Sequence, residues 1–403
     1  MVGCQGRAQG LGCTRESRDE SATPAGVDGQ GSRREQRLWQ MLWSACPGVG
    51  VVRIAQLERE FTGLEAAWWT PCELLASRCG WSALLLHAVE AYRRSWGSDP
   101  LAQANRRWRG GRGVLVPGDG SWPSGLAALQ RPPLWLHWQG RGSLWPLLAR
   151  RAAIAVVGTR QPSAHGLRMA HRIGAQLAAH GWPVVSGLAE GVDAAAHEGC
   201  LAAQGAPVAV LGTPVQRVYP SHHRQLQGRV GRQGLLVSEW PAGAPVRPGH
   251  FASRNRLLVA LAAAVVVVEC PEESGALLSA ELAWSLGLPL WAVPGDAGRT
   301  SSLGSNLLLC RGATPLVRPS DLTDQLGPGP LFGRPAHTGE RRGASPRPGS
   351  PEALVLGSID EEASLETLQS RLNLPEPLLS TSLLQLELAG LVEALPGLCW
   401  RRC

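Results

Sequence analysis

The sequence contains no lysine, and all 39 of its basic residues are arginine. A Walker A phosphate loop, a Schiff base and Ser-Lys chemistry each require a lysine, so these kinds of site are excluded. Guanidinium groups hold phosphates bidentately and stack on bases, which suits a nucleic-acid ligand. Because drift toward arginine explains the composition as a whole equally well, only arginines at particular positions count as evidence.

Cysteine pairs and long apolar runs are missing as well. The ten cysteines include no CxxC pair, so we expect no metal site, and we expect no cofactor. The longest apolar run, 257–268, is shorter than the roughly 20 residues that span a bilayer. Residues 1–36 contain no apolar signal segment. These features predict a cytoplasmic protein without a membrane span, whose cysteines stay reduced.

The chain divides into segments of different pattern. Its 403 residues are 44% hydrophobic and 18% charged, which predicts a globular protein of two or three folded units. At Pro47-Gly48-Val49-Gly50 we favour a plain turn between two helices over a phosphate-binding hairpin. The domains that we predict are a disordered or wrongly started leader (1–36), a helical domain of the helix-hairpin-helix or SAM-like kind (37–110), an α/β domain (111–326), a flexible linker (327–350) and a winged-helix domain (351–403).

Between Ala152 and Val317, short β-rich runs alternate with helical stretches. This alternation predicts a mostly parallel sheet that is covered on both faces by helices. Open α/β sheets bind ligands at the carboxyl ends of their strands, and most of these runs lead into a glycine-bearing turn there. The strands that we predict are 154–157, 183–186, 208–211, 235–239, 265–269 and 290–293.

The first two strand-to-helix corners carry candidate phosphate-binding residues. Gly158-Thr159-Arg160 follows a buried strand, and the amides of the next helix start would attract an anion over which Arg160 closes. Its single glycine departs from the GxGxxG pattern, which argues against NAD. The second corner runs from Ser186 and Gly187 through Gly191 to Asp193, which we expect to cap the following helix. We expect His197, on that helix, to be a packed or capping residue and not a catalytic base.

Two further corners carry aromatic and polar candidates. Phe251 precedes Arg254-Asn255-Arg256, so a stacking surface stands beside groups that contact phosphates and base edges, as a single strand requires. A core phenylalanine that lies by chance near surface arginines is the alternative. Ser274-Gly275 opens another helix after a strand. Four such corners on one edge would form a row of phosphate sites, which suits a polymer better than a small molecule.

Taken together, the corner motifs resemble the DNA-processing protein A (DprA/Smf) family. The resemblance runs in unbroken order from about Trp122 to Val317. The motifs that carry it are Gly158-Thr159-Arg160, Ser186-Gly187-Leu188-Ala189-x-Gly191-Val192-Asp193-Ala194-Ala195-Ala196-His197, Val210-Leu211-Gly212-Thr213, Tyr219-Pro220, Ser238-Glu239, Phe251-x-x-Arg254-Asn255-Arg256, Ser274-Gly275, Val293-Pro294-Gly295 and Gly304-x-Asn306.

The resemblance implies a fold, a function and partners. The fold would be an extended Rossmann-like domain with a helical N-terminal domain and a small winged-helix C-terminal domain. The protein would bind single-stranded DNA, protect incoming DNA, load the RecA recombinase during natural transformation and recombination, form a homodimer and catalyse no reaction. By matching positions, the implied DNA-binding residues are Gly158, Thr159, Arg160, Ser186, Gly187, Gly191, Phe251, Arg254, Asn255, Arg256, Ser274, Gly275 and Asn306.

The distribution of charge distinguishes the α/β domain from the C-terminal domain. Residues 150–320 contain 15 arginines and nine acidic residues, a net charge of +6, whereas residues 351–403 contain three arginines and eight acidic residues, a net charge of −5. Affinity for duplex DNA rests on cationic contacts to its phosphates. We therefore expect the C-terminal domain to contact protein or to be merely structural.

Two other functions remain as alternatives. A nucleotide-binding phosphoribohydrolase-like enzyme could use the same fold, but its PGGxGTxxE loop would fall at Pro271-Glu272-Glu273-Ser274-Gly275, which lacks the paired glycines. A winged-helix transcription regulator would need a basic recognition helix, and 377–388 supplies none. Serine-hydrolase chemistry lacks a GxSxG motif, and we expect His222 and His223 to be surface residues.

Overall fold

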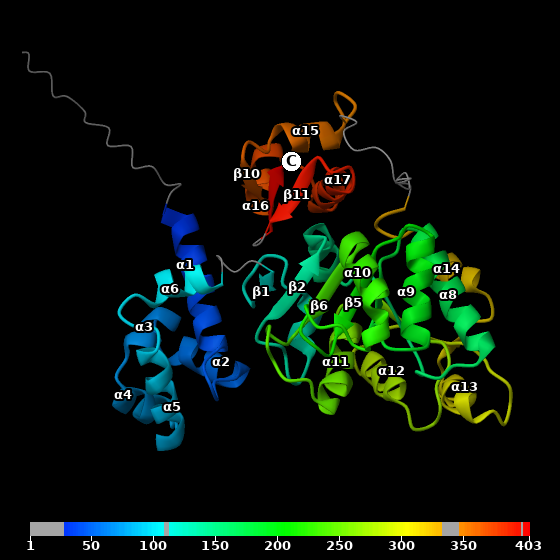
Figure 1. Cartoon of the computed structure of the whole chain (residues 1–403), viewed down its shortest axis with the longest axis horizontal. Coiled ribbons are helices and arrows are strands. Elements are labelled where there is room, and N and C mark those ends of the chain that lie inside the picture. The colour runs from blue at the N-terminus through cyan, green and yellow to red at the C-terminus, as the bar shows by residue number, and fades with distance from the viewer. Residues whose placement is uncertain (1–27, 109–112, 333–345, 396–397) are drawn as a thin grey trace, which may run out of the picture.

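The described residues of the computed structural model are 28–108, 113–332, 346–395 and 398–403. They form a group of helices near the N-terminus, a large α/β unit and a small α/β unit near the C-terminus (Figure 1). Within these ranges, every helix is too short or too polar to cross a membrane.

The N-terminal helices pack around a group of buried tryptophans. The rings of Trp43 and Trp68 meet edge to face with centroids 5.4 Å apart, a favourable aromatic geometry. Trp39, Trp81 and Trp96 are buried in the same core, so this tryptophan-rich part of the chain has a core of its own. The helices are α1 (Asp28–Ser44), α2 (Val51–Glu60), α3 (Leu64–Trp69), α4 (Cys72–Cys79), α5 (Ala83–Arg94) and α6 (Pro100–Arg107).

Helix α1 begins earlier than we predicted. Residues 28–36 fall within the segment 1–36 that we expected to be disordered or wrongly started, but they form the first turns of α1. Arg33 pairs with Glu366 of the C-terminal unit, and Arg37 pairs with Asp119 of the large unit. Of these two pairs, only the Arg33–Glu366 pair lies in the added turns, which it links to the C-terminal unit. Residues 1–27 lie outside the described residues.

The large unit is built on a nine-stranded sheet with the strand order β1-β2-β6-β5-β4-β3-β7-β8-β9. Strand β2 pairs antiparallel with β1 and β6, and the remaining neighbours are parallel. This confirms the mostly parallel α/β fold, and the six predicted strands are all present with ends shifted by only one or two residues. The strands are β1 (Val114–Leu115), β2 (Leu136–Gly140), β3 (Ile154–Val157), β4 (Val184–Ser186), β5 (Pro207–Leu211), β6 (Leu235–Ser238), β7 (Ala264–Val267), β8 (Leu290–Ala292) and β9 (Thr314–Pro315).

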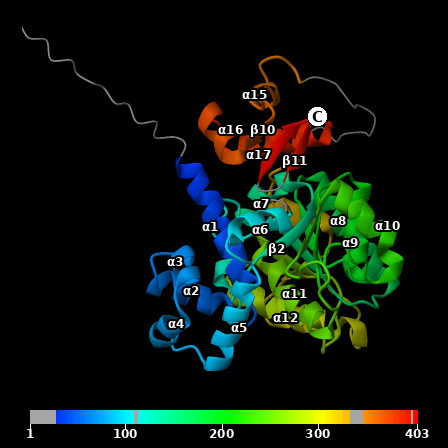
Figure 2. The same ribbon diagram turned by 60° about the vertical axis from the view of Figure 1, so that its left-hand side comes forward.

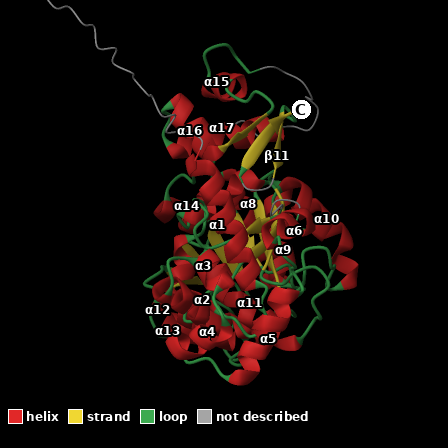
Figure 3. Cartoon of the chain, turned by 90° about the vertical axis from the view of Figure 1, so that its left-hand side faces the viewer, coloured by secondary structure: helices red, strands yellow, loops and turns green. Residues whose placement is uncertain are grey.

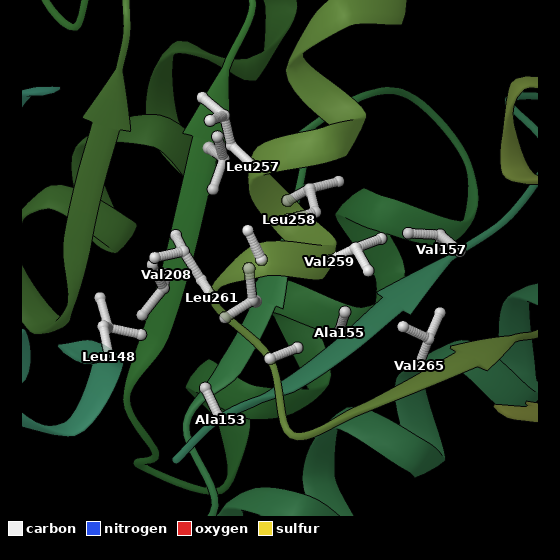
Figure 4. Close-up of a cluster of buried hydrophobic side chains, with 14 of the residues drawn as sticks. Leu148, Ala153, Ala155, Val157, Val208, Leu257, Leu258, Val259, Leu261 and Val265 are labelled. Atoms are coloured by element: carbon white, nitrogen blue, oxygen red, sulfur yellow. The ribbon is translucent and has the colours of Figure 1, made fainter. Parts of the chain in front are cut away.

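Helices cover both faces of this sheet, because successive strand residues point to opposite faces and both sets are apolar (Figure 3). Ile154 and Val156 of β3 enter the core under α8 (Ala164–Ala179), α9 (Val192–Ala202) and α14 (Pro319–Leu326), and α10 (Arg224–Gln233) continues this layer. Ala155 and Val157 enter the core of the other face (Figure 4). That face carries α7 (Trp145–Ala149), α11 (Pro248–Ala260), α12 (Gly275–Ser285) and α13 (Leu303–Cys310).

The segment that we predicted as a flexible linker, 327–350, is partly packed against the large unit. The ring of Phe332 stacks on His180 with centroids 5.8 Å apart, and the indole of Trp182 donates a hydrogen bond to the Gly327 carbonyl. The backbone N–H groups of Gly329 and Leu331 donate to the carbonyls of 180 and 181. These contacts extend the fold to residue 332. Residues 333–345 of the predicted linker lie outside the described residues.

The C-terminal unit consists of helices and a three-stranded antiparallel sheet with the strand order β10-β12-β11. The helix–strand–helix–helix–strand–strand sequence is typical of a winged helix. We predicted the helices and the final hairpin, and the structure adds the short strand β10. The elements are α15 (Pro351–Gly357), β10 (Glu362–Ser364), α16 (Leu365–Leu372), α17 (Glu376–Leu388), β11 (Val392–Leu395) and β12 (Cys399–Arg402).

Helix α17 docks the C-terminal unit onto the large unit, above α7 (Figure 2). Leu384 of α17 joins the core of the large sheet, and Ser143 Oγ donates a 2.6 Å hydrogen bond to Glu387 Oε2. Ser143 follows β2, whose end pairs with the start of β6. The docking site therefore lies at the amino ends of the parallel strands, away from the predicted binding edge.

Burial at this contact gives a pH-dependent prediction. Loss of solvation raises the pKa of Glu387, while Ser143 and Arg141 oppose the shift. When folding raises the pKa of an acid, the folded state binds the proton more tightly than the unfolded state. Stability is therefore greatest below the ordinary pKa of the acid, and it falls as the pH rises and the buried group must become charged. Replacing Glu387 by glutamine, which carries no charge, is expected to stabilise the chain at neutral pH but not at about pH 4. Urea unfolding of both proteins across pH measures this, and a difference independent of pH would contradict it.

Candidate nucleic-acid interface

The structure brings the predicted corners together at the carboxyl ends of β6, β5, β4, β3, β7 and β8, which run parallel. The corner after β3 contacts its neighbours directly: Thr159 N donates to the Glu269 carbonyl at 2.7 Å, and Val192 N donates to the Thr159 carbonyl at 3.2 Å. Gly158 and Gly191 allow this close approach, since a Cβ on either would lie within 3 Å of neighbouring atoms. The predicted row of corners is therefore one continuous surface.

A pocket opens on this edge between the corners after β3, β4 and β5 and the start of α11. It contains four of the predicted residues, Arg160, Gly187, Phe251 and Arg254. We predicted no individual role for the other lining residues, although all of them except Glu190 belong to the motifs that carry the resemblance. The lining residues are Arg160, Gly187, Leu188, Ala189, Glu190, Leu211, Gly212, Thr213, Tyr219, Pro220, Phe251 and Arg254.

A guanidinium group and two aromatic rings form a row across this pocket. Arg160 Cζ lies 5.8 Å from the centroid of the Phe251 ring, and the rings of Phe251 and Tyr219 lie 4.7 Å apart between centroids. Arg160 is exposed and Tyr219 is 46% exposed. Gly212 packs against the Phe251 ring, and this contact holds the ring in place. The row offers two aromatic rings, one of them half-buried, and one exposed guanidinium group at a single site.

Arg254 points into the protein instead of out of the pocket. It is only 5% exposed, its Nη2 lies 3.9 Å from Asp193 Oδ2, and its Nη1 donates to the Val210 carbonyl at 2.5 Å. Burial raises the pKa of Asp193 and lowers that of Arg254, and each charge opposes the shift of the other. A Cβ at Gly187 would lie 1.7 Å from the Arg254 guanidinium. Gly187 is therefore required by Arg254 packing.

Asp193 does not cap helix α9 as we expected. The N-cap of α9 is Gly191, and no side chain caps it. Asp193 Oδ2 instead accepts hydrogen bonds from the backbone N–H groups of Gly187 and Ala189, at 3.1 and 3.4 Å. The carboxylate folds back because these amides and Arg254 lie under the loop after β4. Asp193 thereby fixes the shape of one wall of the pocket.

The other predicted polar residues also have partners within the chain. Arg256 Nη2 lies 2.6 and 2.7 Å from the two carboxylate oxygens of Glu239, so its charge is neutralised. Asn255 donates a hydrogen bond to the Gly275 carbonyl, and this bond joins α11 to the start of α12.

The remaining polar residues of the predicted site bind the backbone. Asn306 both donates a hydrogen bond to the backbone of Gly295 and accepts one from it. Ser186 donates to the Val156 carbonyl, and Ser274 caps α12.

The anion at the start of α8 is a carboxylate of the chain itself. Glu269 is 3% exposed and accepts hydrogen bonds from Ser163 N at 3.2 Å, Ser163 Oγ at 2.7 Å and Ser301 Oγ at 2.5 Å. We predicted a bound anion there with Arg160 closing over it, but the site is filled by Glu269 and Arg160 leans over Phe251. This contact could not be predicted, because Glu269 and Ser163 are far apart in the chain.

The histidines of this edge are structural or exposed. His197 is fully buried, and burial lowers its pKa to about 3, so it is neutral and packed, as we expected. His222 is exposed and lies 3.3 Å from Glu190, and His223 Nδ1 lies 3.0 Å from the Leu188 carbonyl. Within the described ranges, no group of three or more histidine, cysteine or acidic side chains could hold a metal ion.

Comparison with known proteins identifies relatives of this chain. A protein-family model described as DNA recombination-mediator protein A matches residues 113–327. Protein Smf of Synechocystis is 31% identical over 396 residues, which cover 91% of this chain and 99% of the relative. The putative DNA processing protein DprA of Mycobacterium tuberculosis is 37% identical over 315 residues, which cover 73% of this chain and 77% of the relative.

A solved structure shares the fold. The X-ray structure of DNA processing protein A (DprA) from Streptococcus pneumoniae superposes with a TM-score of 0.60 at 23% sequence identity. The match covers 72% of this chain and 97% of that chain. At this identity, the likeness supports the arrangement of sheet and helices and not the roles of particular residues.

Proposed function

Because the chain belongs to the DNA recombination-mediator protein A (DprA/Smf) family, we propose that it binds single-stranded DNA at the carboxyl edge of its large sheet. In this role it takes part in DNA processing and recombination: it protects incoming strands, and it catalyses no reaction of its own. The observation that carries the proposal is the row of Arg160, Phe251 and Tyr219 at one pocket, in which Arg160 and Tyr219 are exposed and Phe251 is half-buried.

The row favours single strands over duplexes. An unpaired base has a free face that stacks on an aromatic ring, whereas the bases of a duplex already stack on each other. The exposed guanidinium of Arg160 can hold a phosphate bidentately next to the stacked base. One cation and two rings at one pocket therefore fit a nucleotide within a flexible strand.

The salt dependence of binding tests whether phosphates are the ligand. We expect the logarithm of the affinity for single strands to fall linearly with the logarithm of salt concentration, with a slope of about −0.7 for each phosphate held. Gel-shift titrations with single-stranded and duplex DNA of one sequence, at several salt concentrations, measure this. We expect much weaker binding to the duplex. Equal affinities for both forms would overturn the proposal.

The absence of catalysis is tested separately. A phosphoribohydrolase-like enzyme would release free base from nucleoside monophosphates, and the corner 271–275 after β7 lacks the paired glycines of such a loop. We expect no base release from a panel of nucleoside monophosphates. Release of any base above the rate without protein would support the enzyme instead.

We infer two protein partners from the family. One is the RecA recombinase, which the chain would load onto the bound strand, and the other is a second copy of the chain in a homodimer. Both would be met in the bacterial cytoplasm, where DNA processing takes place. Sedimentation of the chain alone, and a pull-down of RecA with and without single-stranded DNA, test these partners.

A further inference from the structure

Helix α8 carries a basic stripe on its exposed face. His165, Arg168 and Arg172 follow an i, i+3, i+7 spacing, which places them on one side of the helix, and all three are exposed. The opposite side packs against the sheet and α9. The buried residues of that side are Gly166, Met169, Ala170, Ile173, Gly174 and Leu177.

The charges of the stripe are not neutralised by neighbours. Across the described residues, neither Arg168 nor Arg172 lies within 4.0 Å of a carboxylate, and α8 itself contains no acidic residue. Several other arginines of the large unit do have carboxylate partners, including Arg254, Arg256 and Arg311. Free guanidinium groups on a regular helix face favour an anionic partner.

The stripe follows the proposed DNA site closely in the chain. Helix α8 has Ser163 as its N-cap, three residues after Arg160. At a rise of about 1.5 Å per residue, Arg168 and Arg172 lie roughly 7 and 13 Å along the helix from that cap. A strand that leaves the pocket past Arg160 and runs along α8 would meet these two guanidinium groups in turn.

We propose that this face of α8 is a second contact segment for single-stranded DNA, which holds the phosphates of nucleotides that extend beyond the pocket. The inference rests on the proposed function and adds a direction to it: the strand leaves the pocket along α8. Short strands fill the pocket alone, whereas longer strands also reach Arg168 and Arg172.

The test compares strand lengths in a double variant, Arg168→Ala with Arg172→Ala. With oligothymidine of about 30 nucleotides, we expect roughly a tenfold loss of affinity at low salt, and a salt slope smaller in magnitude by about 1.4, since two phosphate contacts at about 0.7 each are lost. With about six nucleotides, which a single site holds, we expect wild-type affinity. The matched control is Arg229→Ala with Arg232→Ala, which removes two exposed charges from α10.

Three results would overturn the inference. They are an unchanged affinity and slope for the long strand, an equal loss in the α10 control, and an equal loss for the short strand. An acidic protein as the true ligand of α8 would give the first of these. The proposed function is tested independently by Arg160→Ala, which should weaken short and long strands alike, so its failure cannot be confused with a failure at α8.

Discussion

Replacing Arg160 by alanine is expected to lower the affinity for single-stranded DNA about 10- to 100-fold, because a hydrogen bond to a charged group contributes about 1.5–3 kcal/mol. The free energy of unfolding should hardly change, since Arg160 is exposed and its contact is with the face of the Phe251 ring. Gel-shift titration measures the first quantity and urea unfolding the second. The result would separate ligand binding from the integrity of the fold.

The matched control for this variant is Arg150→Ala. Arg150 is also exposed, but it precedes β3 and so lies at the opposite end of that strand from Arg160. It removes the same charge from the same unit, and we expect wild-type affinity. If Arg160→Ala bound single strands as tightly as the wild type, the pocket would not be the DNA site.

Replacing Asp193 by alanine is expected to lower the free energy of unfolding by about 3–5 kcal/mol, because it leaves the charge of Arg254 buried without its partner. The change also removes the acceptor of the Gly187 and Ala189 amides. Urea unfolding measures the loss. The side chain of Asp193 is 8% exposed and that of Arg254 is 5% exposed, so water cannot compensate well.

An exposed ion pair provides the comparison for this variant. Asp296 pairs with Arg299, but the side chain of Asp296 is 72% exposed, so Asp296→Ala should cost at most about 1 kcal/mol. A similar small cost at Asp193 would show that the Asp193–Arg254 contact does not hold the loop after β4. In that case Arg254 would not be held by Asp193 and could contact a ligand.

The stabilities of Asp193→Ala and Asp296→Ala are needed to interpret a third variant, Arg254→Ala. Arg254→Ala would reduce DNA binding whether Arg254 touches DNA or only shapes the pocket. A loss of binding together with a loss of stability would point to the second role. Arg254→Met, which keeps much of the length without the charge, would still leave Asp193 without its cation, so stability must be measured beside affinity.

The strands and the binding edge could be predicted from the sequence because their signals are local. Buried parallel strands read as short apolar runs such as 154–157, and each run ends at a corner with its own small and polar residues. Parallel pairing then places these corners on the same edge of the sheet, whereas the order of the strands could not be read from the sequence. For this reason the place of Arg160 and Phe251 was predictable before any coordinates.

The partners of the charged residues could not be predicted in the same way. The residue types from Phe251 to Arg256 do not show whether each arginine side chain faces solvent or the interior. Arg254 and Arg256 meet Asp193 and Glu239, which are distant in sequence. Glu269 at the start of α8 was missed for this reason, and so was the stacking of Phe332 beyond the expected end of the α/β unit.

The docking of α17 limits what the C-terminal unit can read. In a duplex-binding winged helix, a helix is inserted into the major groove and its side chains touch base edges. Here α17 is held by the Ser143–Glu387 hydrogen bond and by Leu384 in the core of the large sheet. Insertion of α17 into a groove would first expose Leu384 to water. The C-terminal unit could therefore bind duplex DNA in this way only after it separates from the large unit.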